Sequence, residues 1–170
     1  MRSFCYLALL LFLMPAALGA QEVMNNNRLE KILRQEAEKI EGQPGSWMLY
    51  YGERILLAFT DEPNNRMRIF TPIMDEGNLS AAQMSRMLEA NFHSALDAKY
   101  AVYDGFVVSV FTHPLAELTE IQIADALRQI VRLADTFGET YSSTDLIFGP
   151  APDKETEKRI NRSPSRGKRM

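Results

Sequence analysis

Cysteine is almost absent from this chain, and histidine is scarce. One cysteine, Cys5, and two histidines, His93 and His113, occur in 170 residues. Cys5 lies in an N-terminal segment that we expect to be removed on export, so the mature chain would have no thiol. Disulfides, thiolate catalysis and cysteine metal sites are therefore excluded from the mature protein.

Signature motifs of common enzyme classes are absent as well. The sequence has no Gly-x-Ser-x-Gly elbow, no Walker glycine loop and no Gly-x-Gly-x-x-Gly turn, which argues against nucleophile, phosphate and dinucleotide sites. The two histidines are 20 residues apart and neither has a second ligand at helical spacing, so we predict no catalytic residue, metal or cofactor. The alternative is a small exported enzyme in which His113 and carboxylates such as Asp61 or Asp75 converge only in the folded state.

The first residues have the pattern of a secretory signal peptide. Arg2 provides a positive start, residues Phe4–Leu13 are apolar, and Pro15 is followed by small residues. We therefore expect residues 1–20 to be a cleaved signal peptide and the protein to be periplasmic or secreted. An uncleaved membrane anchor is the alternative, because the uncharged stretch approaches the length that spans a bilayer.

Charge is distributed unevenly along the chain. Residues 21–157 carry 12 basic and 22 acidic side chains, a net charge of −10, whereas residues 158–170 carry six basic side chains and no acid. We predict residues 150–170 to be a disordered basic tail, because they contain too few apolar side chains to fold. The tail either contacts an anionic membrane weakly or stays solvated beside the acidic body, and no nucleic-acid partner is expected.

Residues 25–149 have the sequence pattern of one α+β domain. Caps and apolar stripes predict a first helix from Asn25 through Ile40, a second from Ser80 and a third from Thr119 to Gly138. Runs of aromatic and branched residues predict the strands Ser46–Tyr51, Arg54–Thr60, Arg66–Met74, Lys99–Tyr103 and Phe106–His113. The predicted fold is a five-stranded antiparallel sheet packed with three helices in the order α-β-β-β-α-β-β-α.

The clearest local signals are two helix caps and one turn. Ser80 with Gln83, and Thr119 with Gln122, have the spacing of a capping box. The dipeptide Asp104–Gly105 suits the positive backbone angles of a type I′ hairpin turn.

Aromatic residues crowd the first three predicted strands. They include Trp47, Tyr51, Phe59 and Phe70, and the neighbours Tyr50 and Tyr51 must face opposite sides because side chains alternate along a strand. One sheet face is therefore predicted to be partly uncovered and apolar, as at a contact with a partner, unless a helix or loop covers it.

Methionine is the other candidate ligand in a chain without thiols, because its thioether binds Cu(I). Met84 and Met87 share a helix face, whereas Met67 and Met74 are predicted on opposite faces of a strand. We interpret these residues as core filler or as part of an adaptable binding surface.

Four stretches carry a resemblance to a known family: Arg66–Ile73, Leu88–Phe92, Ala95–Ala101 and Phe111–Leu115. Together with the element order, they resemble the type III secretion chaperone-like fold, that is, the Tir chaperone family and its YbjN-type relatives, over roughly residues 25–149. The resemblance implies a small acidic protein that dimerises through its second helix and adjoining strand. It also implies that the protein holds an extended segment of a client without using nucleotide.

This resemblance and the apolar pattern together suggest two sets of contact residues. The dimerisation set is Met84, Met87, Phe92 and Tyr100. The client-contact set, which would dock apolar side chains or add a strand to an open edge, is Trp47, Tyr51, Phe59 and Phe70. We therefore hypothesise a non-catalytic, exported, chaperone-like homodimer that holds an extended or apolar segment of a protein or peptide partner.

Overall fold

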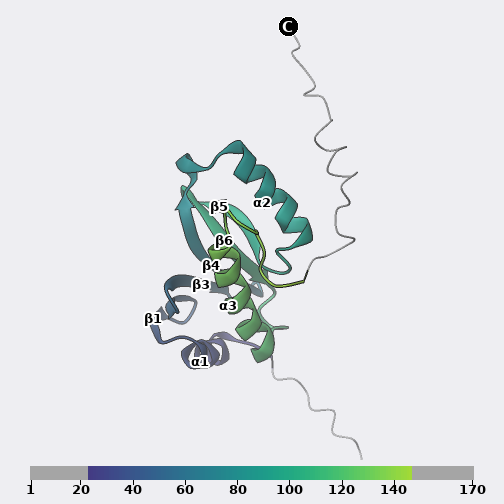
Figure 1. The fold of residues 1–170 in the computed structure, drawn as a ribbon. Helices are drawn as coiled ribbons and strands as arrows, with labels where there is room; N and C mark the ends of the chain where they lie inside the picture. The colour runs from purple at the N-terminus through teal and green to yellow at the C-terminus, as the bar shows by residue number, and fades with distance from the viewer. Residues whose placement is uncertain (1–22, 147–170) are drawn as a thin grey trace, which may run out of the picture.

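The computed structural model describes residues 23–146 (Figure 1). The predicted signal peptide, residues 1–20, and the predicted basic tail, residues 150–170, lie outside this range. Within the range, no helix has the length and apolar character needed to cross a membrane.

The described chain alternates between helices and runs of strands. The first helix, α1 (Asn26–Glu36), precedes four consecutive strands, β1 (Lys39–Gln43), β2 (Ser46–Tyr51), β3 (Arg54–Asp61) and β4 (Arg66–Asp75). The chain then continues through the 3₁₀ turn η1 (Glu76–Asn78), α2 (Ala81–His93), β5 (Lys99–Tyr103), β6 (Phe106–His113) and α3 (Glu120–Asp135).

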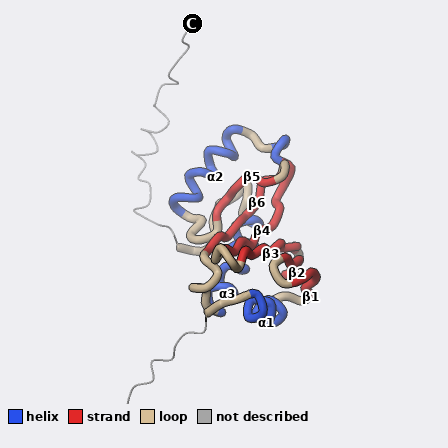
Figure 2. Tube along the Cα trace, turned by 180° about the vertical axis from the view of Figure 1, so that it is seen from behind, coloured by secondary structure: helices blue, strands red, loops and turns tan. Residues whose placement is uncertain are grey.

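All six of these strands form one antiparallel sheet, in the order β1-β2-β3-β4-β6-β5. Helix α3 packs on β4, β5 and β6, and α1 packs on β1 and α3. Helix α2 contacts β5, and Figures 1 and 2 both place α2 at the β5 side of the molecule and α1 at the β1 side. The α+β class and the three helices are confirmed.

The predicted number of strands was wrong, because the sheet has six strands and not five. The first helix ends at Glu36, and Ile40 belongs to β1, where it pairs with Leu49. Gly42 has a φ of +113°, which residues with a side chain rarely adopt. Pro44 and Gly45, the two residues after Gln43, form the tight turn that leads into β2. The apolar positions of this segment fit a helix and a strand equally well, so their spacing alone could not locate the boundary.

The predicted caps and turn are confirmed. Ser80 and Gln83 form a capping box at the start of α2, and Thr119 and Gln122 form another at the start of α3. Asp104 and Gly105 both have positive φ angles, +51° and +79°, as a type I′ turn requires.

The core lies between the sheet and the helices. The sheet face toward α1 and α3 contributes buried side chains from every central strand, among them Trp47, Leu49, Leu56, Met67, Ile69, Val107 and Phe111. A register shift between Pro72 and Met74 turns Met74 toward the same side as Met67, where it packs against this core. The prediction that these two methionines face opposite sides was wrong because this bulge interrupts the alternation of β4.

Candidate functional site

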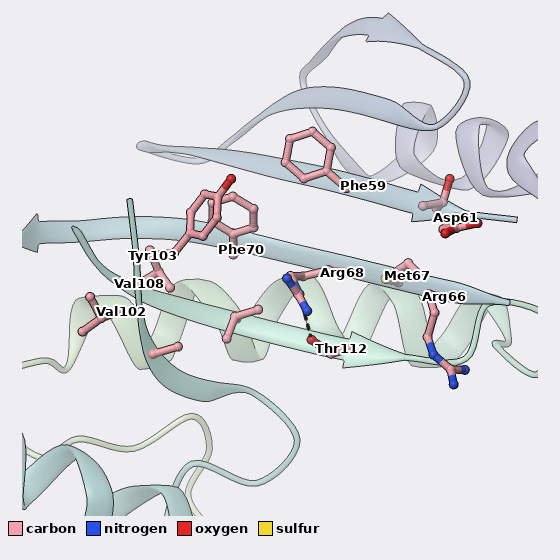
Figure 3. Close-up of a pocket in the computed structure, with 13 residues that line it drawn as sticks. Phe59, Asp61, Arg66, Met67, Arg68, Phe70, Val102, Tyr103, Val108 and Thr112 are labelled. Carbon is pink, nitrogen blue, oxygen red and sulfur yellow. Dashed lines mark hydrogen bonds between the residues drawn. The ribbon is translucent and has the colours of Figure 1, made fainter. Parts of the chain in front are cut away.

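The sheet face opposite α1 and α3, which we call the open face, carries an apolar groove. The groove has a volume of about 570 Å³ and lies across β3, β4, β6 and β5 (Figure 3). In Figure 3 α3 runs behind these strands, on the far side from Phe59, Arg68 and Phe70. The groove is lined chiefly by Phe59, Phe70, Tyr103, Val108, Arg68 and Thr112.

Cross-strand pairing brings these side chains to one face. Phe59 of β3 pairs with Arg68 of β4, which in turn pairs with Thr112 of β6. Phe70 lies two residues beyond Arg68 along β4, so both side chains project from the same face. The groove therefore follows directly from the sheet register.

Three aromatic rings form the apolar part of the groove. The ring centroids of Phe59 and Phe70 are 5.9 Å apart, and those of Phe70 and Tyr103 are 5.3 Å apart in an edge-to-face arrangement. Phe70 at the centre is 5% exposed, whereas Phe59 is 40% and Tyr103 is 55% exposed. Such pairs lie in the preferred geometry of aromatic contacts, so the rings support one another while two of them remain accessible.

Arginine side chains form the other end of the groove. The Nε of Arg68 donates to Oγ1 of Thr112 at 3.4 Å, and Nη1 of Arg66 donates to the carbonyl of Asn65 at 3.0 Å. The carboxylate of Asp61, opposite Arg66, accepts from the backbone and side-chain nitrogens of Asn64. Figure 3 shows the guanidinium of Arg66 extending away from Asp61.

The four predicted client-contact residues do not share one surface. Phe59 and Phe70 line the groove. Trp47 is 2% exposed in the core beneath the helices, and Tyr51 packs against that core beside a separate hollow next to α3. Burial raises the pKa of the Tyr51 hydroxyl.

The sequence reasoning missed Tyr103 as a groove residue. The Asp104–Gly105 turn pairs Tyr103 with Phe106, so the register of this hairpin was available from the sequence. The contact of Tyr103 with Phe70 depends on β6 pairing with β4, which is a long-range pairing that no local pattern indicates.

The predicted dimerisation residues separate into two groups. Met84 and Phe92 are exposed on α2, by 49% and 77%, and Leu88 between them is 66% exposed. These three residues, at positions i, i+4 and i+8, form an apolar stripe that we call the α2 stripe. Leu88 was not among the predicted dimerisation residues, although it lies between Met84 and Phe92 on this face of α2.

Met87 and Tyr100 are core residues in this structure, each 5% exposed. The hydroxyl of Tyr100 donates to the carbonyl of Leu133 at 2.7 Å, and its ring makes edge-to-face contacts with Phe137 and Tyr141. Burial raises the pKa of this hydroxyl well above its ordinary value. Neither side chain is accessible for contact with a second copy.

Helix α2 also covers part of the β5 edge. The side chain of Asn91 accepts from the backbone N–H of Tyr100 at 2.7 Å and donates to its carbonyl at 3.0 Å. The outward backbone groups of β5 are therefore occupied at its second residue. Strand addition along β5 would therefore have to displace Asn91.

The structure does not bring together the predicted enzymatic residues. His113 lies beside a small polar hollow of about 270 Å³, together with Asp97, Asp125 and Gln129, on the helix-covered side. Asp61 lines the groove on the open face, and Asp75 lies at the opposite end of β4 from the residue that pairs with His113. Among the described residues there is no group of three or more histidine, cysteine or acidic side chains able to hold a metal ion.

The two acids near His113 bind a buried amide. Gln129 is 3% exposed, and its Nε2 donates to Oδ2 of Asp125 at 2.7 Å and to Oδ2 of Asp97 at 3.3 Å. Its Oε1 accepts from the backbone N–H groups of Asp97 and Ala98 at 3.1 Å and 3.3 Å. These bonds connect the segment after α2 to α3, which gives both carboxylates a structural role.

Comparison with known proteins identifies the fold. No protein-family model matches the sequence, and no curated protein matches it. Solved structures do match. One is the type III secretion chaperone SycH of Yersinia pestis in complex with a stable fragment of YscM2, with a TM-score of 0.52 and 17% identity over 66% of this chain and 98% of that chain. Another is the ExsC–ExsE complex, with a TM-score of 0.50 and 12% identity over 66% of this chain and 92% of that chain. The chain therefore has the type III secretion chaperone-like fold.

Proposed function

We propose that this chain, with its type III secretion chaperone-like fold, is a non-catalytic binding protein that holds an extended or apolar segment of a protein partner. The observation that carries the proposal is the groove on the open face, where accessible aromatic rings meet arginine side chains. The two structural neighbours were solved in complexes with another polypeptide, which supports a protein partner.

The shape and lining of the groove favour binding over chemistry. Its walls are mostly aromatic and aliphatic, and it lies on a sheet face. Phe59 and Tyr103 are 40% and 55% exposed, so a docked side chain can remove the remaining ring surface from water. Aromatic anchors of this kind dominate the energy of many protein interfaces.

Self-association through α2 is a further part of the proposal. The α2 stripe, Met84, Leu88 and Phe92, presents apolar side chains to solvent at helical spacing. A second copy that packed the same stripe against it would bury all three residues in a two-fold interface. This surface is separate from the groove, because α2 lies along the β5 edge and the groove lies on the open face.

Export is also proposed for this protein, on the sequence of residues 1–20. Intact-mass analysis of protein from the cell envelope and the medium should give an N-terminus at Ala20 or Gln21. Retention of Met1 would contradict cleavage.

Site-specific photo-crosslinking tests the groove directly. We expect Phe59→p-benzoylphenylalanine in the full chain to form an adduct with a partner polypeptide after irradiation in the producing cells. Ile121→p-benzoylphenylalanine is the matched control, because Ile121 is an 80% exposed apolar residue on α3, on the other side of the sheet. Adding Tyr103→Ser, which alters the opposite wall of the groove, should weaken the Phe59 adduct.

Two results would contradict the proposal. One is the absence of any adduct at Phe59, and the other is an equal adduct at Ile121 that Tyr103→Ser leaves unchanged. Intact-mass measurement of the adduct distinguishes a partner polypeptide from a second copy of this chain.

A further inference from the structure

The charges of the groove differ from those of the molecule that carries it. Residues 23–146 have 11 basic and 18 acidic side chains, yet the groove is lined by two basic side chains, Arg66 and Arg68, on one strand and by a single acid, Asp61. An acidic protein with two cations in its apolar groove offers a local charge opposite to its own net charge. This contrast points to the chemistry of what binds there.

Arg68 has no carboxylate partner among the described residues. Its one hydrogen bond is the 3.4 Å contact with the hydroxyl of Thr112, so most of its five N–H donors face solvent in the groove. Arg66 bonds the carbonyl of Asn65 and makes no ion pair within 4 Å in the described part of the chain. The pKa of Glu117 is lowered chiefly by the hydrogen bond from Asn65, with a smaller contribution from the charge of Arg66. Arg68 is therefore the more available of the two cations.

The spacing along β4 sets a register for a bound segment. Arg66, Arg68 and Phe70 alternate along one strand, so their side chains lie about 6.6 Å apart on the same face. An extended peptide has the same repeat. If one residue of the bound peptide docks against Phe70 and Tyr103, the peptide side chain two residues further along lies over Arg68. The peptide side chain four residues further along then lies over Arg66.

We infer that the groove selects an extended partner segment in which an apolar anchor residue is followed or preceded, at the second and fourth positions, by acidic residues. This inference rests on the proposed function and specifies the partner. The apolar residue fills the aromatic part of the groove, and the carboxylates bind the arginines through charge-assisted hydrogen bonds. The basic segment 158–170 of this same chain does not fit, because it would bring six further positive charges to the two arginines.

Fluorescence polarisation with synthetic peptides tests the inference on the full chain. The probes are labelled extended peptides with one phenylalanine in an apolar stretch and with glutamate at the second and fourth following positions. Matched peptides carry glutamine at those positions, and a reversed pair covers the opposite chain direction. We expect the glutamate peptide of the favoured direction to bind about tenfold more tightly than its glutamine counterpart. Raising the salt concentration should reduce this preference.

Variants assign the preference to particular side chains. Arg68→Gln should remove the preference for glutamate and leave binding of the glutamine peptide unchanged. Arg128→Gln, on α3 and away from the groove, makes the same charge change and should leave the preference intact. Phe59→Ser should weaken both peptides, because it removes an aromatic wall.

The possible failures are distinguishable. If glutamate and glutamine peptides bind equally in both directions and Phe59→Ser weakens both, the groove binds apolar segments and the inference about charge is wrong. A preference that survives Arg68→Gln also overturns it. If no peptide binds, or if Phe59→Ser changes nothing, the proposed function of the groove fails and the inference fails with it.

Discussion

Neighbouring residues on α2 should respond to substitution in opposite ways. Met87 is 5% exposed and belongs to the core, whereas Leu88, the next residue, is 66% exposed and lies at the centre of the α2 stripe. If α2 mediates self-association, Leu88→Glu should change the oligomeric state with little effect on the fold. Met87→Ala should destabilise the fold with little effect on the oligomeric state.

The expected magnitudes follow from these exposures. Truncating a buried methionine to alanine costs about 2–5 kcal/mol, and the position of Met87 on a helix at the sheet edge suggests the lower half of that range. Leu88 is already mostly in water in the monomer, and leucine and glutamate are both good helix formers, so Leu88→Glu should cost the monomer no more than about 0.5 kcal/mol. In a two-fold dimer, Leu88→Glu removes about 1–2 kcal/mol of favourable burial energy from each copy. The two copies together make the dimer roughly 30- to 1,000-fold weaker.

Two measurements on both variants are sufficient. Sedimentation velocity over a range of protein concentrations gives the dimer constant, and urea unfolding gives the stability of each variant. An unchanged mass distribution for Leu88→Glu would refute the proposed interface. A loss of dimer in Met87→Ala without a loss of stability would refute the placement of Met87 in the core.

Three further predictions concern the fold that positions the groove. Gln129→Leu should cost about 2–4 kcal/mol in urea unfolding, because it leaves the buried N–H of Ala98 without an acceptor. Gly42→Ala should cost at least about 2 kcal/mol, since its Cβ would lie 2.3 Å from the backbone oxygen of Ser46, whereas Gly52→Ala, with open space around it, should cost only about 1 kcal/mol. Tyr100→Phe should reduce the loss of stability that occurs above about pH 10. Burial raises the pKa of Tyr100 in the folded state above its unfolded value near 10, so the folded chain keeps the proton while the unfolded chain loses it. The wild-type protein therefore loses stability as the pH rises above about 10, and the phenylalanine variant lacks this contribution. A variant and wild type with equal slopes in alkaline urea titrations would contradict this last expectation.

Local chemistry determined which parts of the fold could be predicted. Both capping boxes and the Asp104–Gly105 turn depend on residues within three positions of one another, and all of them occur in the structure as the sequence indicates. Strand β1 was missed because Ala37 and Ile40 continue the apolar spacing of α1. The positive φ angle of Gly42 places this residue in a hairpin. The sequence shows only that residue 42 is a glycine, and a glycine could equally have ended a helix.

The candidate site could be predicted only in part for a different reason. Alternation correctly indicates that the aromatic residues of the first strands divide between two sheet faces. It does not say which face the helices cover, because that depends on how α1 and α3 pack across strands far apart in the sequence. Trp47 therefore proved to be core and Phe59 groove, although both had seemed equally suitable for contact with a client.

The composition of the open face adds to the argument for a binding role of the groove. An antiparallel sheet with one face toward water normally places polar residues on that face. At the β1 edge the open-face positions follow this rule, with Lys39 and Glu41. At the centre of the sheet the same face carries Phe59, Phe70 and Val110 instead. Polar residues there would leave the core on the other face untouched, so core packing does not require these apolar side chains. Docking of an apolar segment would use them, because Phe70 supports the ring of Phe59, whose exposed surface docking would remove from water.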